Sequence, residues 1–179
     1  MSQLTRRLAA TVVIIGSMVA LYDFCVEPFH CNRLKKAVAV STSTAVNRIG
    51  SAEGGIAAQR NLELLKQCRE VGGDLSLLMM TAANERVLGH NGEAIRLYRE
   101  ALRLDQRPEI YYNIAETEVT MGARDQAFDN LLRGSLFNPW MIREIDDGQL
   151  RAAVVQRMLQ LRPENADFIN AVNTLSSAP

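Results

Sequence analysis

The sequence lacks an excess of one charge, and it lacks any tract of low complexity. Its 179 residues include 20 Lys and Arg against 20 Asp and Glu, which leaves a formal net charge of zero. Without a basic excess there is no electrostatic footprint for phosphates, so we expect no nucleic-acid partner. With 47% apolar residues, the chain is long enough to bury a core, and its length suggests one folded domain.

Catalytic motifs are also missing from the sequence. It contains no nucleophile elbow, no phosphate-binding glycine loop and no HExxH motif. Its carboxylates are spread along helix faces that we expect to be exposed, and Glu116 and Glu118 fall on different faces of one helix. His90 and the Asp146-Asp147-Gly148 stretch are typical of turns. We therefore expect no enzyme activity, no catalytic residue and no cofactor.

Only three cysteines are present, Cys25, Cys31 and Cys68. If the body of the protein faces an oxidising compartment, Cys31 and Cys68 are candidates for a disulfide, and Cys25 remains near a membrane surface. The alternative is three free thiols, which the odd number favours. His30 has no further Cys or His partners at the spacing of zinc ligands, so we expect no metal site.

One long uncharged run, Leu8 to Tyr22, follows a polar head at 1–7 that ends in Arg6-Arg7. Apolar residues continue to Val26, so we predict a transmembrane anchor at 8–26, near the lower end of the roughly 17–25 residues that span a bilayer. A cleaved signal peptide and a buried soluble helix are the alternatives, but no Ala-x-Ala cleavage site lies near Ala20.

The orientation of this anchor follows from the basic residues beside it. Arg6 and Arg7 abut the apolar run, whereas Arg33, Lys35 and Lys36 lie further beyond its other end. The positive-inside rule is nearly balanced here, and the closer pair favours a cytoplasmic N-terminus. We predict a single-pass protein of the bacterial inner membrane with its body on the periplasmic side.

Beyond the anchor, the sequence contains the same pattern twice. Four pairs of matched positions are each separated by 33 residues, namely Gly89 and Gly122, Ala94 and Ala127, Ala101 and Gly134, and Leu104 and Phe137. A period near 34 is typical of helix–turn–helix repeats. The glycines suit the reversal after a first helix, because glycine adopts the left-handed conformation at little cost. Pro108 suits the start of a helix.

Other matched positions indicate how these helices pack. Small residues at four of them would let neighbouring helices approach closely: Ala94, Ala101, Ala127 and Gly134. Larger apolar residues would fill the space between the helices: Tyr98, Leu102, Leu104, Leu131, Leu132 and Phe137. Asn138-Pro139 would close the second unit.

These residues make Leu75 to Pro139 similar to the tetratricopeptide repeat (TPR) family, and 150–175 resembles it loosely. The chain departs from the family pattern at Glu85 and Glu118, where an aromatic residue is usual, and at Gln106, where proline is usual. The segment Arg107 to Tyr111 is similar to inner-membrane TPR proteins of bacterial envelope-polysaccharide systems. The resemblance implies an all-α fold, in which an N-terminal transmembrane helix precedes a short α-solenoid of antiparallel helix pairs.

We therefore divide the chain into segments. After the anchor come a juxtamembrane connector at 27–55, a TPR-like domain at 56–175 and a tail at 176–179. The domain contains clear repeats at 75–106 and 108–139, flanked by degenerate caps at 56–71 and 149–175. Gly50-Ser51 and Gly54-Gly55 should interrupt helix before Ile56, which should face the packed side of its helix. Asp74 should cap the helix that begins at Leu75.

The resemblance also implies a concave groove lined by the first helix of each pair. Seven residues fall on its ligand-facing positions: Met79, Ala83, Arg86, Glu109, Tyr112, Asn113 and Glu116. The basic clamp of chaperone-binding members is missing, which favours an extended or apolar segment that touches Met79, Met80 and Tyr112. The alternative is that the methionines and tyrosines belong to the core.

Together these features predict a membrane-tethered scaffold or adaptor that binds another protein, either a peptide segment or a subunit of a membrane complex. The alternative is a structural or accessory subunit of an envelope glycan polymerase, ligase or export complex. A periplasm-only reporter fused after Lys36 would establish the topology.

Overall fold

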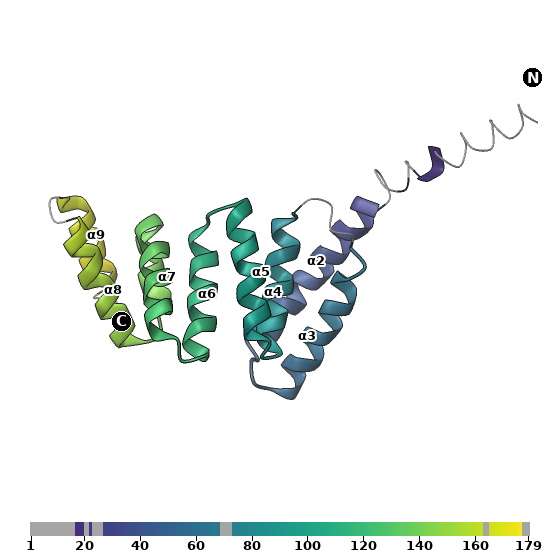
Figure 1. Ribbon diagram of the computed structural model, residues 1–179, viewed down its shortest axis with the longest axis horizontal. Coiled ribbons are helices and arrows are strands. Elements are labelled where there is room, and N and C mark those ends of the chain that lie inside the picture. The colour runs from purple at the N-terminus through teal and green to yellow at the C-terminus, as the bar shows by residue number, and fades with distance from the viewer. Residues whose placement is uncertain (1–16, 20–21, 23–26, 69–72, 163–164, 177–179) are drawn as a thin grey trace, which may run out of the picture. The chain divides into compact units, whose positions relative to one another are not determined.

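A computed structural model describes residues 17–19, 22, 27–68, 73–162 and 165–176 (Figure 1). Every regular element in these ranges is a helix, which confirms the all-α prediction. The chain divides into two compact units, Met1–Gly72 and Gly73–Pro179, and each is described separately. The predicted anchor at 8–26 lies outside the described residues, apart from 17–19 and 22.

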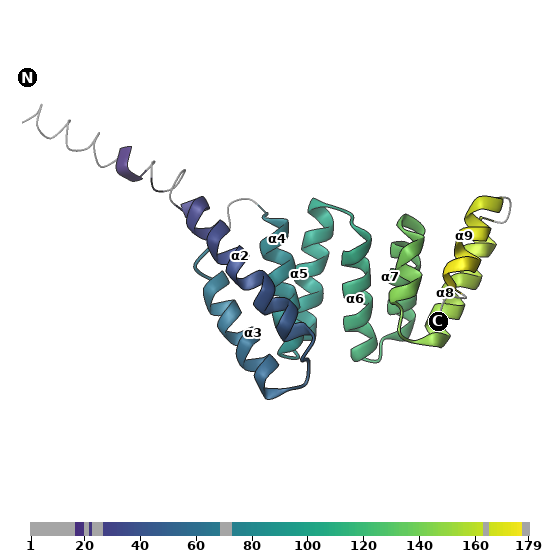
Figure 2. The same ribbon diagram turned by 180° about the vertical axis from the view of Figure 1, so that it is seen from behind.

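The first unit contains a pair of helices, α2 (Glu27–Val46) and α3 (Ala52–Leu65), that pack side by side (Figures 1 and 2). Small and aliphatic side chains make up the buried layer between them: Val38, Ala45, Ala58, Leu62 and Leu65. A buried polar pair crosses the same layer, with Asn61 Nδ2 at 3.5 Å from Thr42 Oγ1. Helix α2 thus occupies most of the segment that the sequence suggested as a connector.

Two expectations for this unit are wrong. Ile56 is 71% exposed and faces solvent, since Ala58, Leu62 and Leu65 form the packed side of α3. Gly54 and Gly55 lie inside α3, and only Gly50, with a φ of +83°, lies in the turn before it. Gly54 is required for close approach, because a Cβ there would lie 2.4 Å from the carbonyl oxygen of Arg48.

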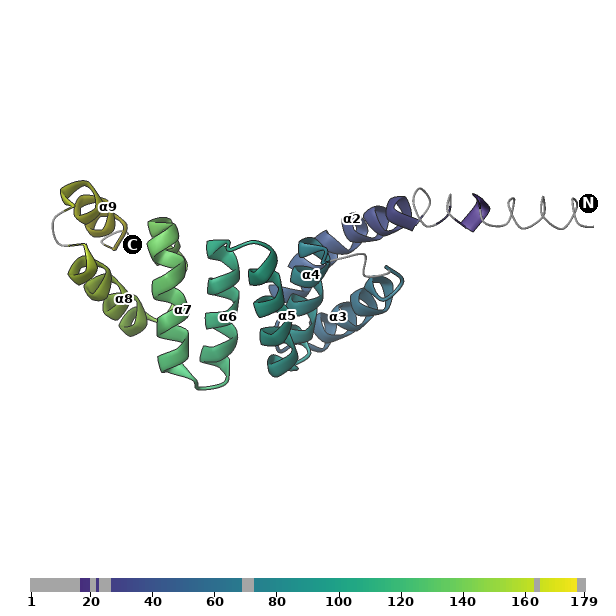
Figure 3. The ribbon, with the colours of Figure 1, turned by 45° about the horizontal axis from the view of Figure 1, so that its top comes forward.

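The second unit begins with two helix hairpins. Helices α4 (Leu75–Val87) and α5 (Asn91–Leu104) form the first, and α6 (Pro108–Thr120) and α7 (Arg124–Phe137) form the second (Figure 3). Asp74 caps α4, since its carboxylate accepts a hydrogen bond from the Leu77 amide at 3.0 Å, as predicted. Pro108 opens α6 within the first turn, also as predicted.

The turns inside the two hairpins have matching backbone conformations. Gly89 and Gly122 both have a φ of +78°, which confirms that each reversal uses the left-handed region. The amide of His90 donates to the carbonyl of Glu85, and the amide of Ala123 donates to that of Glu118, 33 residues further on. The two hairpins therefore reverse direction by the same mechanism.

Small side chains separate the helices of these hairpins. Ala94, Ala101 and Ala127 are fully buried, and a Cβ on Gly134 would lie 3.2 Å from the carbonyl oxygen of Pro108. Two of the larger residues that were expected between the helices are instead exposed, Leu104 by 46% and Phe137 by 59%. Each is the last residue of its helix, where no neighbouring helix continues far enough to cover it.

The remaining elements of the unit are η2 (Pro139–Glu144), α8 (Gly148–Leu161) and α9 (Ala166–Ser176). The 3₁₀ helix η2 occupies what the sequence indicated only as a longer connection. Asp147 caps α8 and pairs with Arg124 at 2.7 Å. The hydrogen bond that it accepts from the Leu150 amide is the main cause of its lowered pKa.

Replacing Gly89 or Gly122 by alanine should each lower the free energy of unfolding by about 1 kcal/mol, because an L residue is strained at positive φ. Lack of space is not the reason, since an added Cβ at either position meets nothing within 4 Å. The matched control is Gly92→Ala inside α5, which also meets nothing within 4 Å and should stabilise by about 0.5 kcal/mol. Urea unfolding followed by circular dichroism measures all three, and an equal effect at the three glycines would contradict this explanation.

Candidate functional site

The predicted groove residues lie on the first helices of the two hairpins. Helix α4 carries Met79, Ala83 and Arg86, and α6 carries Glu109, Tyr112, Asn113 and Glu116. Glu109 is exposed and the other six are half-buried. We call these seven residues the α4/α6 face.

An ion pair joins the two helices across this face. Arg86 Nη1 of α4 donates to the carboxylate of Glu116 on α6, and the two side chains are 11% and 35% exposed. Arg86 Nε is buried and has no hydrogen-bond partner among the described residues. A buried donor without an acceptor costs about 1–3 kcal/mol, so this guanidinium has unused capacity to bind an acceptor.

Two tyrosine hydroxyls lie close to the same ion pair. Tyr112 donates to the backbone carbonyl of Glu144 at the end of η2. Burial raises the pKa of Tyr112 above its ordinary value, and the negative charge of Glu116 adds to the effect. Burial likewise raises the pKa of Tyr98, on α5, to about 12, although the charge of Arg86 opposes it. Both phenols therefore remain protonated at neutral pH, and the charges of Arg86 and Glu116 balance.

Part of the α4/α6 face also contributes to the core. Met79 packs against the buried cluster formed by α4, α5 and the start of α6, and Tyr112 packs against the cluster that extends to α9. The alternative reading of these two residues as core residues therefore holds for part of each side chain. Arg86, Tyr112 and Glu116 are brought together, whereas Glu109 lies in the first turn of α6.

Sequence reasoning missed a second polar cluster, centred on Glu118. We expected its carboxylate to be exposed, which is wrong, because its side chain is 1% exposed. Asn130 Nδ2 of α7 donates to it at 2.8 Å, and Arg99 Nη2 of α5 lies at 3.5 Å. These partners compensate the burial of the charge. The available signal was the recurrence of Glu85 and Glu118 at a position where the family usually has an aromatic residue.

The structure also contains a hollow that does not involve the predicted residues. Its volume is about 210 Å³, and it lies along α5, lined by Gly92, Ile95, Arg96, Arg99, Glu100 and Arg103. Arg96 is paired with Glu93 at 2.7 Å and with Glu100 at 3.1 Å, and Arg99 faces Glu118. Acidic neighbours thus offset most of the positive charge here.

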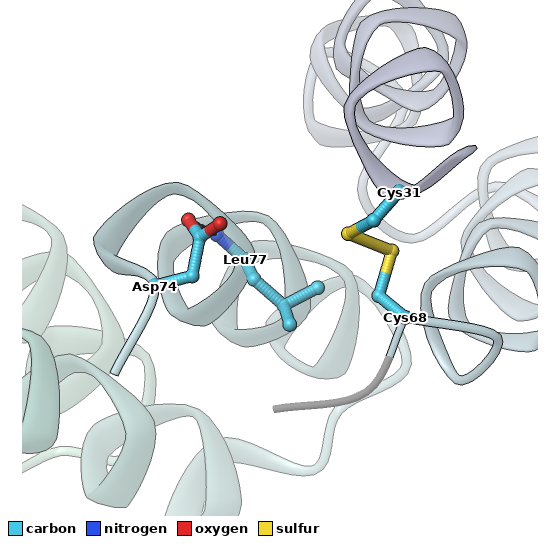
Figure 4. Close-up of a disulfide and its surroundings, with 4 residues drawn as sticks. All are labelled: Cys31, Cys68, Asp74 and Leu77. Carbon is cyan, nitrogen blue, oxygen red and sulfur yellow. Dashed lines mark hydrogen bonds between the residues drawn. A yellow bond between two sulfur atoms is a disulfide. The ribbon is translucent and has the colours of Figure 1, made fainter. Parts of the chain in front are cut away.

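The two cysteines that the sequence offered as a disulfide form one in the first unit (Figure 4). Cys31 lies in the second turn of α2, and Cys68 follows the C-terminal end of α3. Their Cα atoms are 5.1 Å apart, within the usual range for a disulfide. The bond therefore joins the two ends of the α2–α3 pair.

Among the residues that the structure describes, no group of three His, Cys, Asp or Glu side chains could hold a metal ion. In the same part of the chain, no helix has the length and apolar character needed to cross a membrane. In comparisons with known proteins, the chain matches no family model, and no curated protein is significantly similar to it.

Proposed function

We propose that this protein is a membrane-tethered adaptor of the TPR type, without enzyme activity, whose α4/α6 face binds a segment of another protein. The observation that carries the proposal is the Arg86–Glu116 ion pair, which bridges the first helices of two hairpins and leaves Arg86 Nε without an acceptor. Backbone carbonyl and carboxylate oxygens of a bound segment are acceptors for a guanidinium.

The TPR assignment is supported by features that recur 33 residues apart. The left-handed glycines of the two hairpins share a φ of +78°, and the buried alanines Ala94 and Ala127 occupy equivalent positions. Equivalent positions on the α4/α6 face are occupied by Met79 and Tyr112, and by Ala83 and Glu116. Such pairs present a ladder of side chains along consecutive first helices, which suits an extended ligand.

The membrane assignment is supported by the sequence and by the disulfide. The run Leu8 to Tyr22 has no charged residue, and its polar head carries two arginines. Disulfides persist in oxidising compartments, so the Cys31–Cys68 bond favours a periplasmic body and a cytoplasmic N-terminus. Confinement to the inner membrane raises the effective concentration of a membrane-bound partner, so a shallow face with modest affinity is sufficient.

The test is site-specific photo-crosslinking of the full chain in membranes. A photo-reactive amino acid at Asn113 or Glu109, on the α4/α6 face, should give a discrete adduct with a partner protein. The same amino acid at Gln126, which is exposed on α7, should give none and serves as the matched control. Truncation of Arg86 to alanine should reduce the Asn113 adduct at least several-fold while the far-ultraviolet circular dichroism is unchanged.

The alternative function, a structural or accessory subunit of an envelope complex, predicts another outcome. In that case adducts form from Gln126 and other packing surfaces, and Arg86→Ala has no effect on them. Adducts at Gln126 without adducts at Asn113 would overturn the adaptor proposal.

A further inference from the structure

One edge of the second unit carries exposed apolar side chains. Leu104, Phe137 and Trp140 are 46%, 59% and 62% exposed, and we call them the Trp140 edge. Leu104 and Phe137 occupy equivalent positions at the ends of α5 and α7, so both hairpins contribute to it. At the opposite end of α6, Met121 is 53% exposed and has no exposed aromatic residue beside it in the α6–α7 turn.

The helix directions bring these residues to the same edge. Helix α6 begins at Pro108, shortly after α5 ends at Leu104, and α7 returns antiparallel to α6. The C-terminal turn of α7 consequently packs on the first turn of α6, where the Phe137 and Tyr111 rings stack with centroids 6.0 Å apart. Trp140 follows in η2, and its amide donates to Asn138 Oδ1 at 3.2 Å.

The chain enters the second unit at this same edge. Gly73, the first residue of the unit, lies beside the end of α5, since an added Cβ would be 2.9 Å from Leu104 Cδ2. A short stretch of sequence separates Gly73 from Cys68, which is bonded to Cys31. Cys31 in turn follows the uncharged run that ends at Tyr22 by a few residues. The covalent path from that run to the Trp140 edge is therefore short.

We propose that the Trp140 edge lies in the interfacial layer of the membrane that holds the N-terminal segment. Tryptophan is enriched at this depth, because its ring is apolar and its N–H can be hydrated. Arg143 lies over the Trp140 ring at 5.8 Å from its centroid, an arrangement in which the guanidinium can remain among the headgroups. This inference rests on the membrane tether of the proposed function, but not on ligand binding at the α4/α6 face.

Charge does not drive this contact. Near the edge, Arg107 pairs with Asp105 at 2.6 Å, and the basic residues Arg103 and Arg143 are matched by the acidic residues Glu109 and Glu144. The local charge is therefore close to zero. The contact should depend on apolar insertion, and it should persist at high salt, which screens electrostatic attraction to anionic lipids.

The test uses the fluorescence of Trp140, the sole tryptophan in the chain. The full chain is reconstituted in vesicles of phosphatidylethanolamine and phosphatidylglycerol, with or without acyl chains brominated near the headgroup. We expect the brominated lipid to roughly halve the emission and the spectrum to shift to the blue, equally in low and high salt. Phe137→Ala and Leu104→Ala should weaken the quenching, whereas Met121→Ala, the matched control, should not.

Each failure has a distinct result. A chain that floats with the vesicles but shows no quenching overturns this inference and leaves the tether intact. A chain that does not float with the vesicles overturns the tether. Quenching that disappears at high salt, or that Met121→Ala weakens as much as Phe137→Ala does, also overturns the inference, because the contact would then be electrostatic or nonspecific.

Discussion

Replacing Cys31 and Cys68 by serine should lower the stability of the α2–α3 pair by about 4 kcal/mol, the loop-entropy value for a sequence separation of 37. The effect should be large because the buried layer of this unit consists of small and medium-sized side chains such as Ala45, Ala58 and Val38. Hydrogen exchange measured by mass spectrometry should show protection in α3 falling by about a thousandfold.

The matched control for this experiment is Cys25→Ser, which removes the third cysteine and should leave the protection of α3 unchanged. Reduction of the unsubstituted chain should reproduce the effect of the double replacement, whereas protection of α6 and α7 in the second unit should change little. Equal protection of α3 with and without the disulfide would contradict the prediction, and would mean that the packing of α2 on α3 is sufficient.

Replacing Ile114 by alanine should lower the free energy of unfolding of the second unit by about 3 kcal/mol. Ile114 is 1% exposed and belongs to the core shared by α4, α5 and α6. The lost side-chain atoms leave a cavity that the surrounding helices fill only in part. Urea unfolding followed by circular dichroism should show the midpoint move to lower urea.

Met121→Ala provides the comparison, because Met121 follows the same helix but is 53% exposed. Its substitution should change the free energy by no more than about 0.5 kcal/mol. If the two substitutions destabilised the unit equally, the burial of Ile114 between the hairpins would not be the source of its contribution.

The helices of the second unit could be predicted from the sequence because their signals are local. Asp74 and Pro108 mark helix starts, and Gly89 and Gly122 mark reversals, each through the conformation that its own residue favours. The same local reasoning failed at Gly54, where glycine serves a close approach to Arg48 inside α3 instead of a break. That approach depends on a turn that precedes the helix, and no local pattern reports it.

Burial was harder to predict than helix position. Periodicity identified apolar stripes, but it could not show that a helix ends before its last apolar residue is covered, as happens at Leu104 and Phe137. Glu118 was missed for the opposite reason. Its burial depends on Asn130 and Arg99, which come from other helices, and a single helix face does not reveal such partners.

The candidate site was predictable as a set of residues but not as a set of contacts. The family resemblance placed Arg86, Tyr112 and Glu116 on one face, and the structure has all three there. Neither the ion pair between Arg86 and Glu116 nor the hydrogen bond from Tyr112 to Glu144 follows from spacing. Both join segments about 30 residues apart, and their geometry depends on how the hairpins pack.

The disulfide has a mechanical consequence. A pulling force between the N-terminal segment and the second unit would pass from Cys31 to Cys68 through the sulfur atoms, so the chain between them would carry almost no tension. In the reduced protein the same force would unwind α2 and α3, and their chain would extend by up to about 130 Å. The oxidised form therefore acts as a short strap of fixed length, and the reduced form as a long, extensible one.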